Sequence, residues 1–232
     1  MRSLVFDRAP EIVVASTLTP GSVFGTLSCA HEPPRLSVVI PCRDRERVIG
    51  QQLEALASQR FDGPWEVIVA DNGSTDGTRE VAESFRDRLP GLRVVDASAR
   101  RGPGHARNAG ARAARGESLL FIDDDDEIQP GFLAAMAAAL ETHDFVASAR
   151  DMEKLNRSPI QRLRANPQRD GLQRAWYAPH LPFSGGSGLA IKRALHDRVG
   201  GFDETMRYGQ DNDYCFEVQL ETGRSCASCP TR

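Results

Sequence analysis

Short apolar runs alternate with segments of helical spacing through the central part of the chain. The runs are four or five residues long and nearly continuous, which is typical of strands buried on both faces. They lie at 36–40, 67–70, 92–95 and 118–122. Helices are predicted between them, after Asp44 as N-cap and over 78–88 and 105–115. This alternation predicts an α/β fold with a mostly parallel central sheet covered by helices on both faces.

The pattern weakens on either side of this region. Residues 1–35 mix Gly, Ser, Thr and Pro, which indicates an N-terminal arm or linker. Residues 150–180 predict a long connection, and the glycine-rich stretch 183–191 predicts a strand or loop. Helices are predicted over 192–199 and 211–221, followed by a short tail at 222–232 without a further strand. We therefore expect one domain over 36–221.

Composition excludes some classes of function. The chain has 232 residues, 40% of them hydrophobic, and a formal net charge of -3, which argues against a nucleic-acid partner bound through bulk charge. No run approaches the ~20 apolar residues of a transmembrane helix, and Asp7 interrupts the N-terminus too early for a signal peptide. Five cysteines, an odd number, favour a reducing compartment. A cytoplasmic protein is expected, with peripheral membrane contact left open.

Four consecutive carboxylates, Asp123 to Asp126, follow the apolar run 118–122. Side chains alternate along an extended backbone, so Asp123 and Asp125 can point one way and Asp124 the other. Two convergent carboxylates are typical of a Mg²⁺ or Mn²⁺ site to which substrate phosphates add ligands. The alternative is a solvated acidic turn before the helix that follows Pro130.

A second polar cluster, Asp71 to Gly77, follows the run 67–70. Ligands of parallel sheets collect at the carboxyl ends of the strands, where a carboxylate can accept hydrogen bonds from a base or ribose. The alternative is purely local, because Asp, Asn, Gly and Ser all favour turns and helix caps.

Six motifs in order give the chain a family resemblance between about Leu36 and Glu221. It resembles the family 2 glycosyltransferases, enzymes of the GT-A fold that use nucleotide-activated sugars. Residues 66–78 are similar to E-I-I-V-V-D-D-G-S-T-D-G-T, and 121–130 to F-L-D-x-D-D-x-x-x-P. The remaining motifs are the first strand at 36–41, A-R-N-x-G within 102–110, V-G-G-F-D-E at 199–204 and G-E-D-x-D at 209–213.

The resemblance implies an inverting, metal-dependent transferase of cell-wall or polysaccharide biosynthesis. A sugar would pass from a nucleoside diphosphate donor to a hydroxyl of a glycan, lipid or small-molecule acceptor. Asp71 would contact the nucleotide base, Asp123 and Asp125 of the D-x-D motif would hold Mg²⁺ or Mn²⁺, and Asp211 would be the general base. The other implied nucleotide-sugar contacts are Pro41, Arg107, Asp123, Asp124 and Gly186.

Several of these residues have plainer interpretations. Arg107 either steadies the diphosphate or belongs to a basic helix face with Arg112 and Arg115. Asp211 can cap the last helix as well as act as a base. The segment around Gly186 is either a close approach to the sugar or an ordinary glycine turn.

The chain also departs from the family pattern. Asn72 replaces the second Asp of the second motif, Gln210 replaces a Glu, and Pro41-Cys42-Arg43-Asp44 replaces the commoner P-T-Y-N. Trp176 and Tyr177 are expected to pack under the long connection, with stacking on an acceptor sugar as the alternative.

Two rival functions remain. The chain ends soon after the last motif, so a truncated, catalytically impaired remnant that binds sugar nucleotides is the first. A nucleotidyltransferase is the second, but no glycine-rich loop follows the first strand. Cys226 and Cys229 have C-x-x-C spacing without an evident second ligand pair, so no zinc site is expected there.

Overall fold

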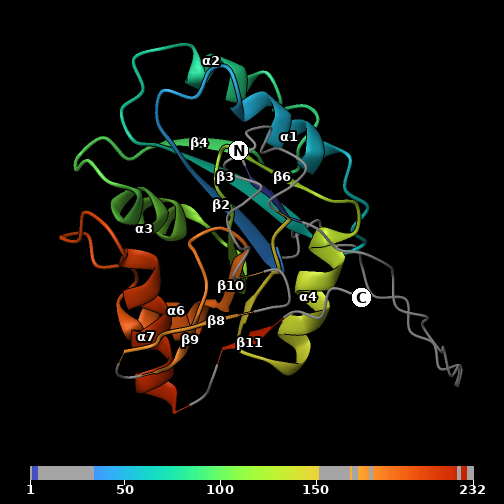
Figure 1. Cartoon of the computed structure of the whole chain (residues 1–232). Helices are drawn as coiled ribbons and strands as arrows, with labels where there is room; N and C mark the ends of the chain where they lie inside the picture. The colour runs from blue at the N-terminus through green and yellow to red at the C-terminus, as the bar shows by residue number, and fades with distance from the viewer. Residues whose placement is uncertain are drawn as a thin grey trace, which may run out of the picture.

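The computed structural model describes residues 2–4, 34–151, 168, 172–177, 180–223 and 226–228, with backbone alone for 2–4 and 228. A twisted central sheet lies between two layers of helices (Figure 1). Its strand order is β11-β7-β10-β5-β2-β3-β4. The strands are β2 (Leu36–Cys42), β3 (Trp65–Asp71), β4 (Arg93–Asp96), β5 (Ser118–Phe121), β7 (Phe145–Ala147), β10 (Leu189–Lys192) and β11 (Ala227–Ser228).

The four strands β5, β2, β3 and β4 run parallel, as the alternating pattern predicts. Strand β10 runs antiparallel to both β5 and β7, and β11 joins the edge parallel to β7. The mostly parallel α/β sheet is therefore confirmed. The sequence pattern does not predict β11, because a two-residue edge strand is too short to show periodicity.

Alternating residues of each strand enter two separate cores. Val38 and Ile40 pack into the first core with α1 (Ile49–Ala57), α2 (Thr78–Glu83) and α4 (Phe132–Thr142). Val39 points to the opposite face, whose core includes residues of α3 (Pro103–Ala113), α6 (Arg193–Val199) and α7 (Gln210–Thr222). All seven residues of β2 are buried, which explains the continuous apolar run of its sequence.

Two small sheets flank the central one. Strand β1 (Arg2–Leu4) pairs in parallel with β6 (Asp126–Ile128), directly after the acidic cluster. Strand β8 (Gln173–Arg174) pairs antiparallel with β9 (Pro182–Phe183). The expected connection 150–180 lies mostly outside the described residues. None of the described helices has the length and apolar character needed to span a membrane.

The predicted N-cap of the first helix is wrong. Helix α1 begins at Ile49 after Val48, and no side chain caps it. Asp44 has a left-handed backbone with φ of 51°, and its carboxylate accepts a hydrogen bond of 2.8 Å from the Thr75 amide. Its capping oxygen is therefore used between two loops at the edge of the sheet, and not at the helix.

Candidate active site

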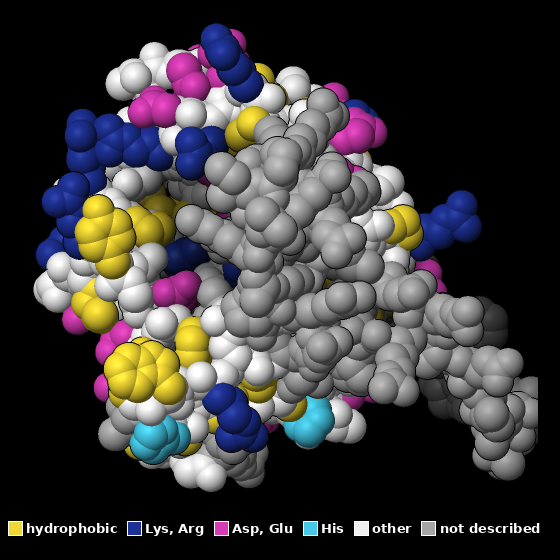
Figure 2. Space-filling model, viewed as in Figure 1, with side chains coloured by type: hydrophobic (Ala, Val, Ile, Leu, Met, Phe, Trp, Pro, Cys, Tyr) yellow, Lys and Arg dark blue, Asp and Glu magenta, His cyan; other side chains and the backbone are white. Residues whose placement is uncertain are grey.

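The candidate site lies at the edge of the sheet where β2, β3 and β5 end. Because β10 is antiparallel to β5 and Leu189 pairs with Phe121, the segment before β10 starts at this same edge. Residues 184–188, here called the glycine segment, therefore lie beside the carboxylates that follow β5. Figure 2 shows a hollow in this face in which acidic and basic side chains lie close together.

Asp123 is fixed at this edge by two contacts. Its backbone amide donates a hydrogen bond of 2.9 Å to the Ser187 hydroxyl of the glycine segment. Its carboxylate accepts one of 2.7 Å from Nη2 of Arg107 on α3. The side chain of Asp123 remains 30% exposed, so a ligand can still reach the second carboxylate oxygen.

Arg107 does not lie on a solvated basic face. It is only 4% exposed, whereas the side chain of Arg112 on the same helix is 61% exposed. Nε and Nη1 of Arg107 are buried without a hydrogen-bond partner among the described residues. A Cβ added to Gly186 would lie 2.4 Å from Nη2, so only glycine allows the guanidinium this position. The buried cation thus faces the glycine segment from one side and Asp123 from the other.

Asp211 approaches the same segment from α7. Its Oδ2 accepts a hydrogen bond of 3.0 Å from the Gly186 amide, and its Oδ1 accepts one from the amide of Asn212. It does not cap α7, because Gly209 occupies the N-cap position. Adjacent residues, Gly186 and Ser187, therefore hold Asp211 and Asp123 at one place.

Two other carboxylates of the acidic cluster, Asp124 and Asp126, are more deeply buried. Burial raises the pKa of Asp124 to about 6, although Arg45 donates a hydrogen bond of 3.0 Å to its Oδ1. Burial also raises the pKa of Asp126 to about 7. The charges of Asp123 and Asp125 raise both pKa values further. This is the signature of negative charge packed together without full compensation.

These carboxylates fit a divalent cation. Four consecutive acids, two of them buried with raised pKa values, would gain from a bound cation, and oxygen is the ligand that Mg²⁺ and Mn²⁺ prefer. Within the described ranges, no three acidic, His or Cys side chains converge as a complete metal site. The donor set therefore suits a cation that takes further ligands from substrate phosphates.

At the end of β3, Asp71 forms the local turn that its sequence allows. Its Oδ1 accepts a hydrogen bond of 2.9 Å from the Ser74 amide, and Arg79 donates one of 3.2 Å to Oδ2. Pro41, on neighbouring β2, pairs with Ala70. Pro41 and Asp71 thus lie together at the C-terminal ends of β2 and β3. Strand β2 is the neighbour of β5, which Asp123 follows.

The side-chain amide of Asn72, the residue after Asp71, makes hydrogen bonds that a carboxylate could not make. Its Nδ2 donates hydrogen bonds to the carbonyls of Ala97 and Arg100, at 2.5 and 2.8 Å, and its Oδ1 accepts one from the Gly102 amide. A carboxylate could not donate to two carbonyls. This departure from the family motif fastens the 97–102 loop at the start of α3.

Two of the motifs contact each other in a way that the sequence does not predict. Asn108 of α3 accepts a hydrogen bond from the Phe202 amide and donates to the Phe202 carbonyl. Glu204 accepts from Asn108 at 2.9 Å and lies 2.6 Å from Nδ1 of His105. The V-G-G-F-D-E motif therefore holds α3, and with it Arg107, in place. In the sequence, the only sign of this contact is the helical spacing of the polar residues His105 and Asn108.

Arg150 is another residue that sequence reasoning missed. It is 6% exposed, and its Nη2 donates a hydrogen bond of 2.8 Å to the Ser187 carbonyl. Its guanidinium packs against Gly185, where a Cβ would lie 2.8 Å from Nη1. A buried arginine thus lies against each of two adjacent glycines, Arg150 at Gly185 and Arg107 at Gly186.

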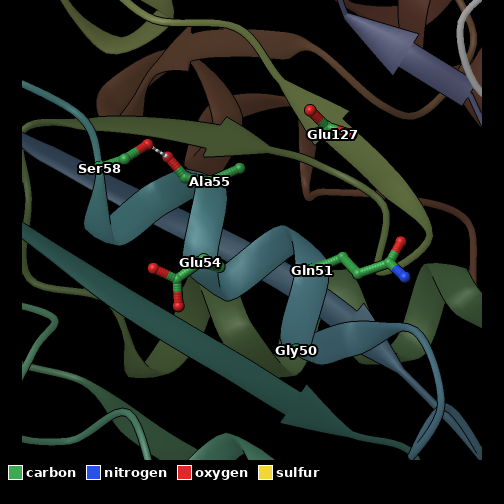
Figure 3. A pocket seen from close by; sticks show the side chains of 6 residues that line it. All are labelled: Gly50, Gln51, Glu54, Ala55, Ser58 and Glu127. Carbon is green, nitrogen blue, oxygen red and sulfur yellow. Dashed lines mark hydrogen bonds between the residues drawn. The ribbon is translucent and has the colours of Figure 1, made fainter.

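The expectation that Trp176 packs under the long connection is wrong. Its side chain is 87% exposed, and that of Tyr177 is 43% exposed. A shallow depression elsewhere, between α1 and β6, contains none of the predicted site residues (Figure 3). It is lined by Gly50, Gln51, Glu54, Ala55, Ser58 and Glu127.

Comparison with known proteins decides the family. The model of the family described as glycosyl transferase family 2 matches residues 37–200, which is most of the described sheet and its helices. The chain belongs to glycosyltransferase family 2.

The relatives and solved structures agree with this family 2 membership. A Bacillus subtilis protein described as the uncharacterized glycosyltransferase YwdF is 29% identical over 187 residues, covering 78% of this chain and 66% of its own length. The Staphylococcus aureus poly(ribitol-phosphate) beta-N-acetylglucosaminyltransferase TarS is 37% identical over 111 residues, covering 47% of this chain and 19% of its own.

Two solved structures are similar over most of the chain. TarS residues 1–349 in complex with UDP-GlcNAc has a TM-score of 0.62 at 26% identity, covering 80% of this chain and 53% of that one. The mannosyltransferase PcManGT from Pyrobaculum calidifontis, in complex with GDP-Man and Mn²⁺, has a TM-score of 0.61 at 28% identity, covering 86% and 55%. The fold is therefore that of GT-A glycosyltransferases, and the chain spans at most about two thirds of these proteins.

Proposed function

We propose that the protein transfers a sugar from a nucleoside diphosphate donor to a hydroxyl acceptor, with inversion at the anomeric carbon and with Mg²⁺ or Mn²⁺. The observation that carries this proposal is the convergence of Asp123 and Asp211 on Ser187 and Gly186. Adjacent residues of one segment would thereby hold the carboxylate proposed to bind the metal and the proposed general base. The proposed transferase domain covers 36–221, with 1–35 as an arm and 222–232 as a tail.

The residues at the C-terminal ends of the strands would contact different parts of the donor. Asp71 and Pro41 would contact the nucleotide, and Asp123, Asp124 and Asp125 would lie at the diphosphate with the cation. When bound, the cation would offset the charge that develops on the leaving diphosphate. Similar structures bound to UDP-GlcNAc, or to GDP-Man and Mn²⁺, support this class of donor.

Arg107 and Gly186 would act beside the diphosphate. Nε and Nη1 of Arg107 are buried without described partners, so a phosphate oxygen would satisfy a donor that is otherwise costly to bury. At Gly186 the absence of a side chain leaves room for the guanidinium of Arg107.

Asp211 would take the proton of the acceptor hydroxyl as its oxygen attacks the anomeric carbon. Its Oδ2 is oriented by the Gly186 amide, and this contact places the base against the segment that also positions Asp123. A positioned carboxylate base typically contributes 10²–10⁴-fold to the rate. Attack from the face opposite the leaving diphosphate inverts the anomeric centre without a covalent sugar–enzyme intermediate.

A donor screen tests this proposal. Nucleoside diphosphate release is followed with UDP- and GDP-sugars in Mn²⁺ or Mg²⁺, with glycan, lipid and small-molecule acceptors, for the parent protein and Asp125→Ala. We expect acceptor-dependent release that Asp125→Ala abolishes. Donor binding without turnover on any acceptor would favour a binding remnant instead.

A further inference from the structure

An exposed aromatic surface adjoins the glycine segment. It consists of the exposed rings of Trp176 and Tyr177 and the half-buried rings of Phe183 and Phe216. The Trp176 and Tyr177 rings meet edge to face with centroids 5.6 Å apart, and Tyr177 meets Phe216 in the same way at 6.5 Å. Phe216 in turn contacts Phe183, with centroids 5.9 Å apart. Trp176 is thus the outermost ring of a continuous cluster of aromatic rings, here called the aromatic cluster.

The aromatic cluster belongs to the same elements that hold the candidate base. Phe216 and Asp211 both lie on α7, and Phe183 lies in β9, three residues before Gly186. The chain from Pro182 to Gly186 runs along α7 through Gln219–Pro182, Cys215–Ser184 and Gly186–Asp211 contacts. Three extended residues span about 10 Å, so Phe183, the inner end of the surface, lies within about that distance of the Gly186 amide that contacts the candidate base. Trp176 lies further out, beyond Phe216 and Tyr177.

The exposure of Trp176 leaves its indole ring accessible to a ligand. A tryptophan that is 87% exposed leaves a large apolar ring in water, and apolar surface beside a site commonly marks a binding surface. The edge-to-face contact with Tyr177 can cover one face of the indole ring at most, so the other face stays open. A flat apolar face suits a sugar ring, whose C–H groups form an apolar face while its hydroxyls stay in water.

We propose that Trp176, supported by Tyr177 and Phe216, is the binding surface for a pyranose ring of a glycan acceptor. This inference rests on the proposed function, because it assumes that the acceptor hydroxyl reaches Asp211. It narrows the acceptor from any hydroxyl compound to a saccharide long enough for one sugar unit to contact Trp176 while another reaches Asp211. The stacked ring orients the acceptor and takes no part in bond making.

The tryptophan content makes a direct binding test possible. The chain has two tryptophans, so in Trp65→Phe all tryptophan fluorescence comes from Trp176. Acrylamide quenching of this variant is measured with methyl glucoside, methyl galactoside, methyl mannoside and methyl N-acetylglucosaminide, and separately with phosphatidylglycerol vesicles. We expect at least one glycoside to protect Trp176 in a saturable manner. Protection by none of them, or by the vesicles alone, overturns the proposal, the latter in favour of a membrane contact.

A kinetic test separates this inference from the proposed function. Trp176→Ala should raise the KM for a saccharide acceptor about tenfold with little change in kcat, and Trp176→Phe should restore most of the affinity. Leu220→Ala is the matched control, because Leu220 is 62% exposed on α7, the helix that carries Phe216, and is not part of the aromatic cluster. An equal effect of both alanine variants overturns the proposal. Donor binding, measured calorimetrically, reports on the proposed function alone.

Discussion

The guanidinium of Arg107 donates a hydrogen bond of 2.7 Å to the carboxylate of Asp123 while two of its other nitrogens stay buried and unpartnered among the described residues. A cation of the chain therefore occupies the position next to the proposed metal ligand. This ion pair partly neutralises Asp123 before a donor arrives. It also leaves Nε and Nη1 of Arg107 for the diphosphate oxygen proposed above.

Removal of Arg107 should have opposite effects on metal and donor. Without the neighbouring positive charge, Arg107→Met should bind Mn²⁺ alone about tenfold more tightly, since such charges commonly shift carboxylate pKa values by about 1–3 units. Binding of the donor should weaken. Calorimetric titration with Mn²⁺ and then with donor measures both effects.

Arg112→Met is the control for that experiment, because Arg112 lies on the same helix and its exposed side chain pairs with Glu204 at 3.5 Å. The control should change neither affinity. Unchanged or weaker Mn²⁺ binding by a folded Arg107→Met protein would contradict the competition between Arg107 and the metal.

Gly186→Ala should be destabilising and inactivating. Its Cβ would lie 2.4 Å from Nη2 and 2.7 Å from Cζ of Arg107, so the guanidinium would have to move away from Asp123, and loss of the hydrogen bond between them costs about 1–3 kcal/mol. Gly50→Ala is the matched control, because its Cβ would meet Val81 at an ordinary 3.6 Å within α1. That variant should gain up to about 1 kcal/mol from helix propensity. Chemical denaturation of both variants tests the contrast, which equal free energies of unfolding would refute.

Asn72→Asp should destabilise the protein although the family motif carries Asp at this position. The new carboxylate would face the carbonyls of Ala97 and Arg100 and leave them without donors, at a cost of about 1–3 kcal/mol for the buried carbonyl of Ala97. Thermal unfolding should show a lower Tm at pH 8 and a partial recovery at acidic pH, where a protonated acid can donate once. A Tm equal to that of the parent at pH 8 would show that these contacts carry no stability.

The buried acidic cluster predicts a pH-dependent stability. Because the folded-state pKa of Asp126 is raised to about 7, the folded protein binds its proton more tightly than the unfolded chain. Stability is therefore lost as the pH rises from about 4 to about 7, by a contribution on the order of 4 kcal/mol. Asp126→Asn should remove this loss.

Urea denaturation in EDTA from pH 4 to pH 8 measures that effect. The free energy of unfolding of Asp126→Asn should increase relative to the parent across this range and level off above about pH 7. Parallel curves for the two proteins would contradict a buried, proton-binding Asp126.

Strong local signals explain why most of the fold could be predicted from the sequence. Continuous apolar runs such as 36–40 predict strands buried on both faces, and the alternation with helices predicts the parallel sheet. The prediction that Asp44 caps the first helix was wrong, because its carboxylate contacts Thr75, 31 residues away in the chain. Strand β11 is set by pairing with β7 and has no pattern of its own.

The candidate site was only partly visible in the sequence for a similar reason. Asp71, Asp123 and Asp211 follow from ordered motifs, and the structure places Asp123 and Asp211 at one segment. The burial of Arg107 could not be predicted, because helix α3 also carries the exposed Arg112. Arg150 was missed because it lies far from any motif, and the exposure of Trp176 depends on tertiary packing alone.

The anomeric configuration of the first-formed product tests the central claim most directly. Proton NMR during a single turnover with an α-linked UDP-sugar, Mn²⁺ and an accepted hydroxyl compound distinguishes α from β product. The account predicts a β-linked product from the parent protein and a rate about 10²–10⁴-fold lower for Asp211→Asn, whose amide oxygen can still accept from Gly186. An α-linked product, or undiminished transfer by Asp211→Asn, would contradict an inverting mechanism with Asp211 as its base.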